Sequence, residues 1–183
     1  MAERWLLITL STGGPSSTLR VHAWRKLRAL GAHALGQSAY LVPQRPSTVR
    51  TVNRLMARVQ REGARGTVLQ VALPDDREER ETIARFSAER TDEYREIVER
   101  TREFLAELAM ERDRGRMTYT EVEESGADLT RFQKWLAAVR ARDYFEADGH
   151  AEAAAAVAAC EQALSEFEAE AFASELAPER PEV

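Results

Sequence analysis

Residues 5–10 read WLLITL, an apolar run with the length of a buried strand, and turn-forming residues follow it at 11–18. Four further patterns follow in order: helical spacing at 19–30, a hairpin at 32–43, helical spacing at 46–59 and an apolar strand at 67–72. This order predicts a ferredoxin-like β-α-β-β-α-β unit, in which two helices cover one face of a four-stranded sheet. Gly31 and Gly63 stand where the two helices are expected to end.

The rest of the chain carries helical patterns. We expect a weakly helical charged segment at 77–88, an amphipathic helix at 94–108, a short helix after Thr118, a helix capped by Asp128 and a last helix around 157–171. The apolar seam of the last helix is predicted to pack within the molecule, because it covers only about two heptads. The fold class is therefore predicted as α+β, with a bundle of helices after the sheet.

Charge separates these two parts. From Met1 to Ala72 the chain has eleven Lys and Arg against two acidic residues, a net charge of +9, so the remainder carries −14 of the total of −5. We predict a basic ferredoxin-like domain at 1–73, an acidic α-helical domain at 74–176 and a disordered tail at 177–183. A basic segment of this size attracts polyanions. The alternative is that the basic part docks onto the acidic part within one molecule or dimer.

The overall composition is that of a globular protein, with 183 residues, 44% hydrophobic and 31% charged. The single cysteine, Cys160, has no partner for an internal disulfide, which suits a reducing compartment. No apolar run approaches the length of a membrane helix, and residues 5–10 lack the cleavage site of a signal peptide. The sequence thus predicts a cytoplasmic protein with no membrane association.

No pattern of residues indicates catalysis or metal binding. His22, His33 and His150 are scattered without partners at ligand spacing, whereas a zinc site needs three or four converging ligands. Cys160 lies in an alanine-rich helix, where cysteine more often packs than reacts. We therefore expect no metal, no cofactor and no enzymatic activity.

Both predicted helices of the first part carry rows of cations that suit a polyanion. The candidate nucleic-acid-binding residues are Arg20, Trp24, Arg25, Lys26 and Arg28 on the first helix and Arg50, Arg54, Arg58 and Arg61 on the second. An exposed Trp24 would stack on a base or support an arginine. The alternative for Trp24 is a place in the core, which is more common for tryptophan.

A second polar cluster ends a helix in the acidic part. The cluster consists of Arg140, Arg142 and Asp143, and we interpret it as a hydrogen-bonded knot that locks this helix to its neighbours. The alternative is an oxyanion-sensing site.

Several stretches, in order, resemble the N-terminal domain of the ChrB chromate-resistance regulators. They are WLLI at 5–8, RVHAWRKLRALG at 20–31, AYLVP at 39–43, FLAEL at 104–108, TYTEVEE at 118–124 and RARDYF at 140–145. The first part also looks like the ferredoxin-like middle domain of PaaX-type repressors. The resemblance covers roughly residues 5–172. It implies a transcriptional regulator that binds promoter DNA and releases it when chromate is present, although sensing in this family is usually ascribed to a further C-terminal domain.

Three functions follow from these observations. The first is a DNA-binding regulator, expected as a homodimer because paired basic faces match the symmetry of double-stranded DNA. The second is an interaction module that pairs with a separate chromate- or oxyanion-sensing protein and does not touch DNA. The third is a nuclease like the ferredoxin-like CRISPR-associated endonucleases. It ranks last because Leu10, Ser11 and Thr12 stand where those enzymes have a metal-binding acid.

Overall fold

The computed structural model describes residues 3–11 and 17–176, and the predicted tail at 177–183 lies outside this range. The chain divides into two compact units. The first comprises Met1–Ala88 together with Arg142–Phe145, and the second comprises Glu89–Ala141 and Glu146–Val183. Among the described helices, none combines the length and the apolar character needed to cross a membrane.

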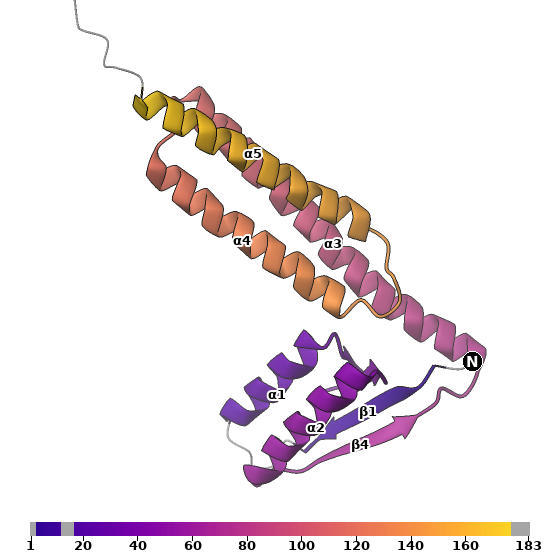
Figure 1. Ribbon diagram of the computed structural model, residues 1–183. Coiled ribbons are helices and arrows are strands. Elements are labelled where there is room, and N and C mark those ends of the chain that lie inside the picture. The colour runs from indigo at the N-terminus through magenta and orange to yellow at the C-terminus, as the bar shows by residue number, and fades with distance from the viewer. Residues whose placement is uncertain (1–2, 12–16, 177–183) are drawn as a thin grey trace, which may run out of the picture. The chain divides into compact units, whose positions relative to one another are not determined.

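The first unit is built on a four-stranded antiparallel sheet (Figure 1). Its elements, in chain order, are β1 (Trp5–Leu10), α1 (Ser17–Ala29), β2 (His33–Ala34), β3 (Ala39–Pro43), α2 (Pro46–Arg61) and β4 (Gly66–Val71). The strand order is β2-β3-β1-β4, and each neighbouring pair is antiparallel. The predicted succession of strands and helices is thereby confirmed.

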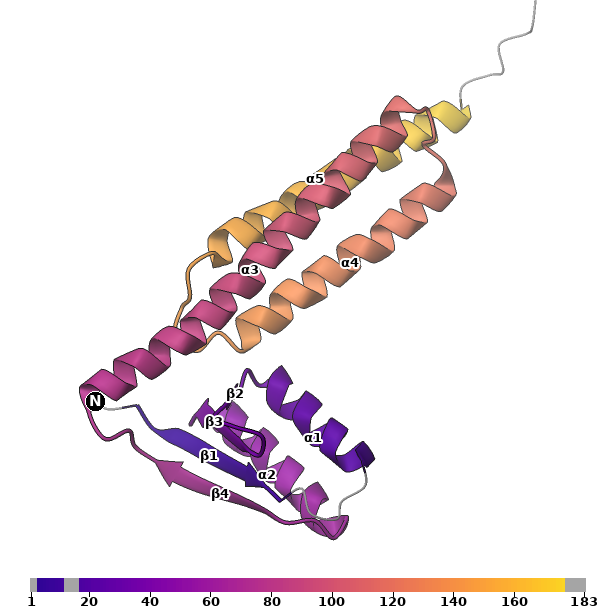
Figure 2. The ribbon, with the colours of Figure 1, turned by 180° about the vertical axis from the view of Figure 1, so that it is seen from behind.

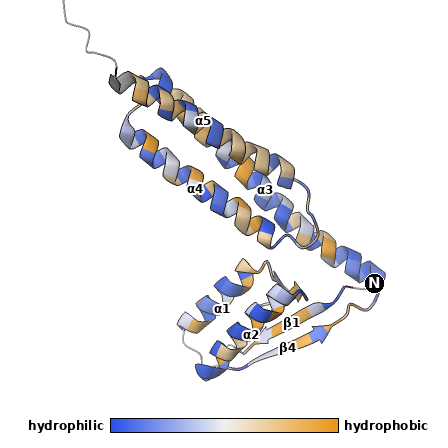
Figure 3. Cartoon of the chain, in the orientation of Figure 1, coloured by the Kyte–Doolittle hydropathy of each residue, from blue (hydrophilic) through white to orange (hydrophobic). Residues whose placement is uncertain are grey.

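Helices α1 and α2 cover one face of the sheet, as the view from behind also shows (Figure 2). Alternation along β1 sends Leu6 and Ile8 to this face, where they pack against Leu27 of α1 and Val52 of α2. Both helices alternate hydrophobic and hydrophilic residues along their length (Figure 3). The buried stripes of the two helices are Leu19, Ala23 and Leu27 of α1 and Val52, Leu55 and Val59 of α2.

The opposite face of the sheet is covered by an aromatic cluster. The ring of Trp5 lies 5.4 Å from that of Phe86 and 5.8 Å from that of Phe145, and Leu41 of β3 completes the cluster. Phe145 belongs to the short segment 142–145, which joins this unit from far along the chain. Beside it, the Tyr144 hydroxyl donates a hydrogen bond of 2.7 Å to the carbonyl of Leu30, at the end of α1.

Local hydrogen bonds fix where α2 begins. The Thr48 hydroxyl donates to the Pro43 carbonyl at 2.8 Å and accepts from the backbone N–H of Arg45 at 2.8 Å. Arg45 in turn binds both carboxylate oxygens of Glu3, at 2.6 and 2.9 Å. Gly31 and Gly63 follow the two helices with φ of 64° and 76°, a conformation that costs glycine little, so both predicted helix ends are confirmed.

The second unit packs three helices around one apolar core. These are the part of α3 (Asp76–Asp113) that follows Ala88, α4 (Tyr119–Ala141) and α5 (His150–Leu176). Ile97 and Phe104 of α3, Val139 of α4 and Phe167 of α5 lie in the centre of this core. The seam of α5 is buried within the unit, as predicted.

Two sequence-based boundaries were wrong. Residues 77–88 are helical, as predicted, but they form the first turns of the continuous helix α3 rather than a separate segment. The Asp75 carboxylate caps this helix by accepting the N–H groups of Arg77 and Glu78, each at 2.9 Å. Likewise, α4 is one helix, and Asp128 lies inside it, paired with Arg131, rather than at a cap. Packing of Leu129 and its apolar neighbours against the core outweighs the cost of about 1 kcal/mol for a glycine, here Gly126, inside a helix.

Candidate nucleic-acid interface

Helix α1 presents cations on two flanks. Leu19, Ala23 and Leu27 form its buried stripe, and the polar residues lie on either side of that stripe. On one flank, Arg20, Trp24 and Arg28 follow one another at intervals of four residues, and on the other flank lie His22 and Lys26. The predicted cations of this helix, Arg20, Arg25, Lys26 and Arg28, are all exposed.

The second flank of α1 faces α2 across a polar groove of about 320 Å³, which we call the α1–α2 groove. Its lining residues are His22, Lys26, Thr51, Arg54, Leu55 and Arg58. Three of the predicted cations therefore converge here, one from α1 and two from α2. Arg54 and Arg58 are one helical turn apart, about 6 Å along the axis. The predicted residues Arg50 and Arg61 are exposed on α2 but do not line the groove.

Arg58 is held in place by two contacts. Its Nε donates to the Glu62 carboxylate at 2.7 Å, one turn further along α2. Its terminal nitrogen lies 3.1 Å from Nε2 of His22, and the guanidinium must be the donor because it has no acceptor atom. Arg58 is thus oriented across the groove before any ligand binds.

His22 is kept neutral by its surroundings. Burial lowers the pKa of His22 below its ordinary value, and the charges of Arg58 and Lys26 lower it further. The carboxylate of Glu62 acts in the opposite direction but does not reverse the shift. At neutral pH the imidazole therefore accepts a hydrogen bond from Arg58 and adds no charge of its own.

The charges around the α1–α2 groove are one-sided. No Asp or Glu occurs between Arg4 and Glu62 in the sequence. Among the residues that the structure describes, Arg58 is the only cation of α1 and α2 with an ion pair. In the second unit, by contrast, Arg95, Arg100 and Arg112 each pair with a carboxylate of that unit. The uncompensated positive charge of the first unit is therefore concentrated on α1 and α2.

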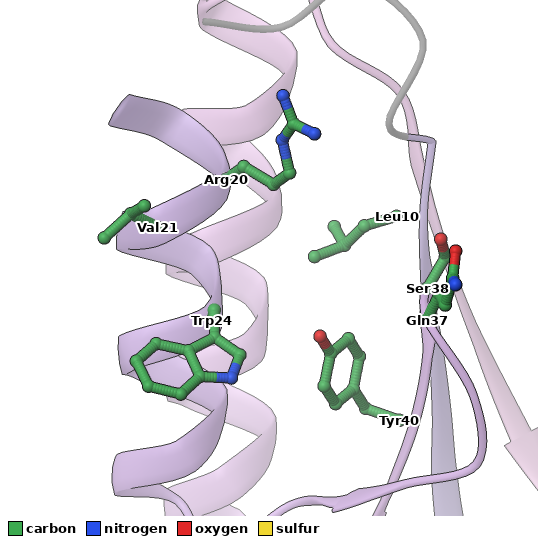
Figure 4. Close-up of a pocket in the computed structure, with 7 residues that line it drawn as sticks. All are labelled: Leu10, Arg20, Val21, Trp24, Gln37, Ser38 and Tyr40. Atoms are coloured by element: carbon green, nitrogen blue, oxygen red, sulfur yellow. The ribbon is translucent and has the colours of Figure 1, made fainter. Parts of the chain in front are cut away.

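The other flank of α1 borders a second, larger cavity of about 510 Å³ (Figure 4). Trp24 and Arg20 reach it from α1, and Tyr40 reaches it from β3. Trp24 is 46% exposed, so the prediction that it lies at the surface is confirmed and the alternative place in the core is wrong. The guanidinium of Arg28 lies 5.3 Å from the centre of the indole ring, within reach of a cation–π contact.

The predicted cluster at the end of α4 does not form part of either cavity. Arg140 is exposed and belongs to the second unit, whereas Arg142 and Asp143 are half-buried, belong to the first unit and both have partners. The hydrogen-bonded knot stays a prediction.

Sequence reasoning missed His22 as part of a site, although its spacing of four from Lys26 was a signal that both residues share one flank.

Within the described ranges, no group of three His, Cys, Asp or Glu side chains is placed to hold a metal ion. Burial raises the pKa of the Cys160 thiol to about 11, so it stays protonated at neutral pH. Its sulfur contacts the carbonyl of Thr101 at 3.6 Å inside the helical core. Cys160 is thus a packing residue of the second unit.

Comparison with known proteins places these features in a family. Residues 20–178 match the family model described as "Protein ChrB, N-terminal". A similar protein is Protein ChrB of Cupriavidus metallidurans, which is 31% identical over 153 residues, corresponding to 81% of this chain and 43% of the relative. The chain thus spans less than half the length of that protein. No solved structure matches the chain.

Proposed function

This chain belongs to the ChrB N-terminal family, and we propose that it is a DNA-binding regulator of a chromate-resistance system. The observation that carries DNA binding is the α1–α2 groove, where Lys26, Arg54 and Arg58 converge. Among the described residues that line this groove none is acidic, and Glu62 beside it pairs with Arg58. Duplex DNA is a polyanion, and cations from two adjacent helices neutralise successive phosphates of one strand. The cations flanking the groove, such as Arg25 and Arg50, extend the contact.

Several finer features belong to the same proposal. The order of elements, the antiparallel strand pairs and the two helices on one face support a ferredoxin-like classification of the first unit, as in PaaX-type repressors. A homodimer would place two α1–α2 grooves on one duplex, in keeping with the symmetry of operators. Chromate would act by weakening this complex.

Fluorescence anisotropy with a labelled duplex from the region upstream of the protein's own operon tests DNA binding. The affinity is expected to fall steeply as salt rises from about 50 to 200 mM, with a log–log slope of about −3 or steeper if the three groove cations each contact a phosphate. Adding chromate is expected to reduce the affinity at fixed ionic strength, with sulfate as the control anion. Absence of binding at about 50 mM salt would refute DNA binding and favour a module that pairs with another protein.

The pH dependence of binding is predicted from His22. A bound phosphate offsets the charges of Arg58 and Lys26, so it raises the pKa of His22 from its lowered value, and binding takes up a proton. Affinity is therefore expected to increase as the pH falls from about 7.5 to about 5.5, the range around the ordinary histidine pKa. The measurement is the same anisotropy titration at constant ionic strength.

The variant His22→Gln keeps a hydrogen-bond acceptor for Arg58 but cannot take up a proton. It should bind DNA with an affinity that no longer changes over this pH range. A His33→Gln variant is the matched control, since His33 lies on β2, outside the α1–α2 groove, and it should keep the pH dependence. An unchanged pH profile in His22→Gln would show that another group takes up the proton.

A further inference from the structure

The larger cavity beside α1, which we call the Trp24 pocket, has the composition of a ligand site. Its volume of about 510 Å³ falls within the range of small-molecule sites. The lining combines apolar walls with a few polar groups from three parts of the first unit: Leu10 from β1, Arg20 and Trp24 from α1, and Gln37, Ser38 and Tyr40 from the hairpin. Such a mixture fixes the orientation of a bound molecule.

Trp24 is not needed for the packing of α1. The core of this helix consists of Leu19, Ala23 and Leu27, which are almost fully buried, whereas Trp24 leaves 46% of its surface in water. A large aromatic side chain held at the surface in this way favours contact with another flat molecule, because stacking removes one face of each ring from water. Arg28 over the indole helps to hold the ring in place.

The pocket offers separate places for an aromatic ring and for an anion. Figure 4 shows the rings of Trp24 and Tyr40 on either side of the pocket, one carried by α1 and the other by β3, with the guanidinium of Arg20 at one end. Arg20 has no ion-pair partner among the described residues, and no acidic side chain lines the pocket. Gln37 and Ser38 add side chains that both donate and accept hydrogen bonds, as the edge of a base requires.

We propose that the Trp24 pocket binds a nucleotide, with its base against Trp24 and Tyr40 and its phosphate on Arg20. The ligand is either a free mononucleotide or an unpaired nucleotide of a DNA strand, and the two share this chemistry. The proposal goes beyond the binding of paired duplex DNA. It concerns the flank of α1 opposite to the one that lines the α1–α2 groove, so either site can exist without the other.

Isothermal titration calorimetry of the full chain with adenosine 5′-monophosphate, adenosine and ribose 5-phosphate tests the free-ligand form. We expect the monophosphate to bind most tightly and ribose 5-phosphate most weakly. Trp24→Ala should weaken binding of the monophosphate by about tenfold or more, as expected for the loss of base stacking. Arg20→Gln should remove the preference for the monophosphate over adenosine, while Leu69→Ala, an exposed apolar residue of β4, should change nothing.

A second pair of probes tests the strand-borne form: a fully paired duplex and the same duplex with one unpaired adenine. If the pocket takes a nucleotide from a strand, Trp24→Ala should weaken binding of the duplex with the unpaired adenine by about tenfold more than it weakens binding of the paired duplex. The proposal is supported if the chain binds the monophosphate, or if Trp24→Ala selectively weakens binding of the duplex with the unpaired adenine. If Trp24→Ala changes neither the binding of the monophosphate nor the binding of the duplex with the unpaired adenine, the proposal is wrong. Binding of the paired duplex and its salt slope depend on the α1–α2 groove, so they report separately on the proposed function.

Discussion

Replacing Arg54 and Arg58 together by glutamine is expected to weaken binding of duplex DNA by about a hundredfold or more at constant salt. Each arginine contributes a charge-assisted hydrogen bond of about 1.5–3 kcal/mol to a phosphate, and about 1.4 kcal/mol corresponds to tenfold in affinity. The slope of log affinity against log salt should become shallower by about two, since two phosphates are no longer neutralised. Anisotropy titrations across a salt series measure both quantities.

The matched control is Arg95→Gln with Arg131→Gln, which removes the same charge from exposed positions of α3 and α4 in the second unit. If DNA binds through the first unit, this control should retain the affinity and slope of the unchanged chain to within about twofold. Equal losses in both double variants would show that net charge alone drives binding, and the α1–α2 groove would have no special part. Arg54→Lys with Arg58→Lys should recover the slope, because lysine keeps the charge.

Replacing Trp5 by alanine is expected to destabilise the first unit by about 3–5 kcal/mol. Trp5 is fully buried, and its ring contacts Phe86 of α3 and Phe145 of the segment 142–145. Its loss leaves a large cavity between three chain segments that are far apart in the sequence. Urea denaturation measures the loss in the free energy of unfolding. Hydrogen exchange of the native protein then localises the loss, with peptides from β1 and β3 reporting on this unit and α5 peptides of the second unit as the internal reference.

Trp5→Phe should cost much less, about 1 kcal/mol, because it keeps most of the ring and removes an N–H group. That buried N–H has no hydrogen-bond partner among the described residues, and such a group itself costs about 1–3 kcal/mol. Leu69→Ala on the same face of the sheet removes a side chain that is already 50% exposed and should have only a small effect. If Trp5→Ala were no more costly than Leu69→Ala, the aromatic cluster would contribute little to the stability of the unit.

Prediction from the sequence worked best where a local pattern dominates. The apolar run at 5–10, the helical stripes and the glycines after both helices placed every element of the sheet unit to within a few residues. It missed the continuity of α3 through 77–88 and of α4 through Asp128, where the local pattern is weak and contacts with distant residues decide. Phe86, for example, supports the start of α3 by packing against Trp5, which no local periodicity indicates.

The candidate site shows the same division. The sequence by itself determined that the positive charge lies on two helices and which residues carry it, because charge and helical spacing are properties of neighbouring residues. Only the tertiary structure decided that Lys26, Arg54 and Arg58 share one groove with His22, and that Arg20 and Trp24 line another. The reason is the packing of α1 and α2 on one sheet face. That packing sets which flank of each helix meets its neighbour, and the flanks differ by only one or two positions in the sequence.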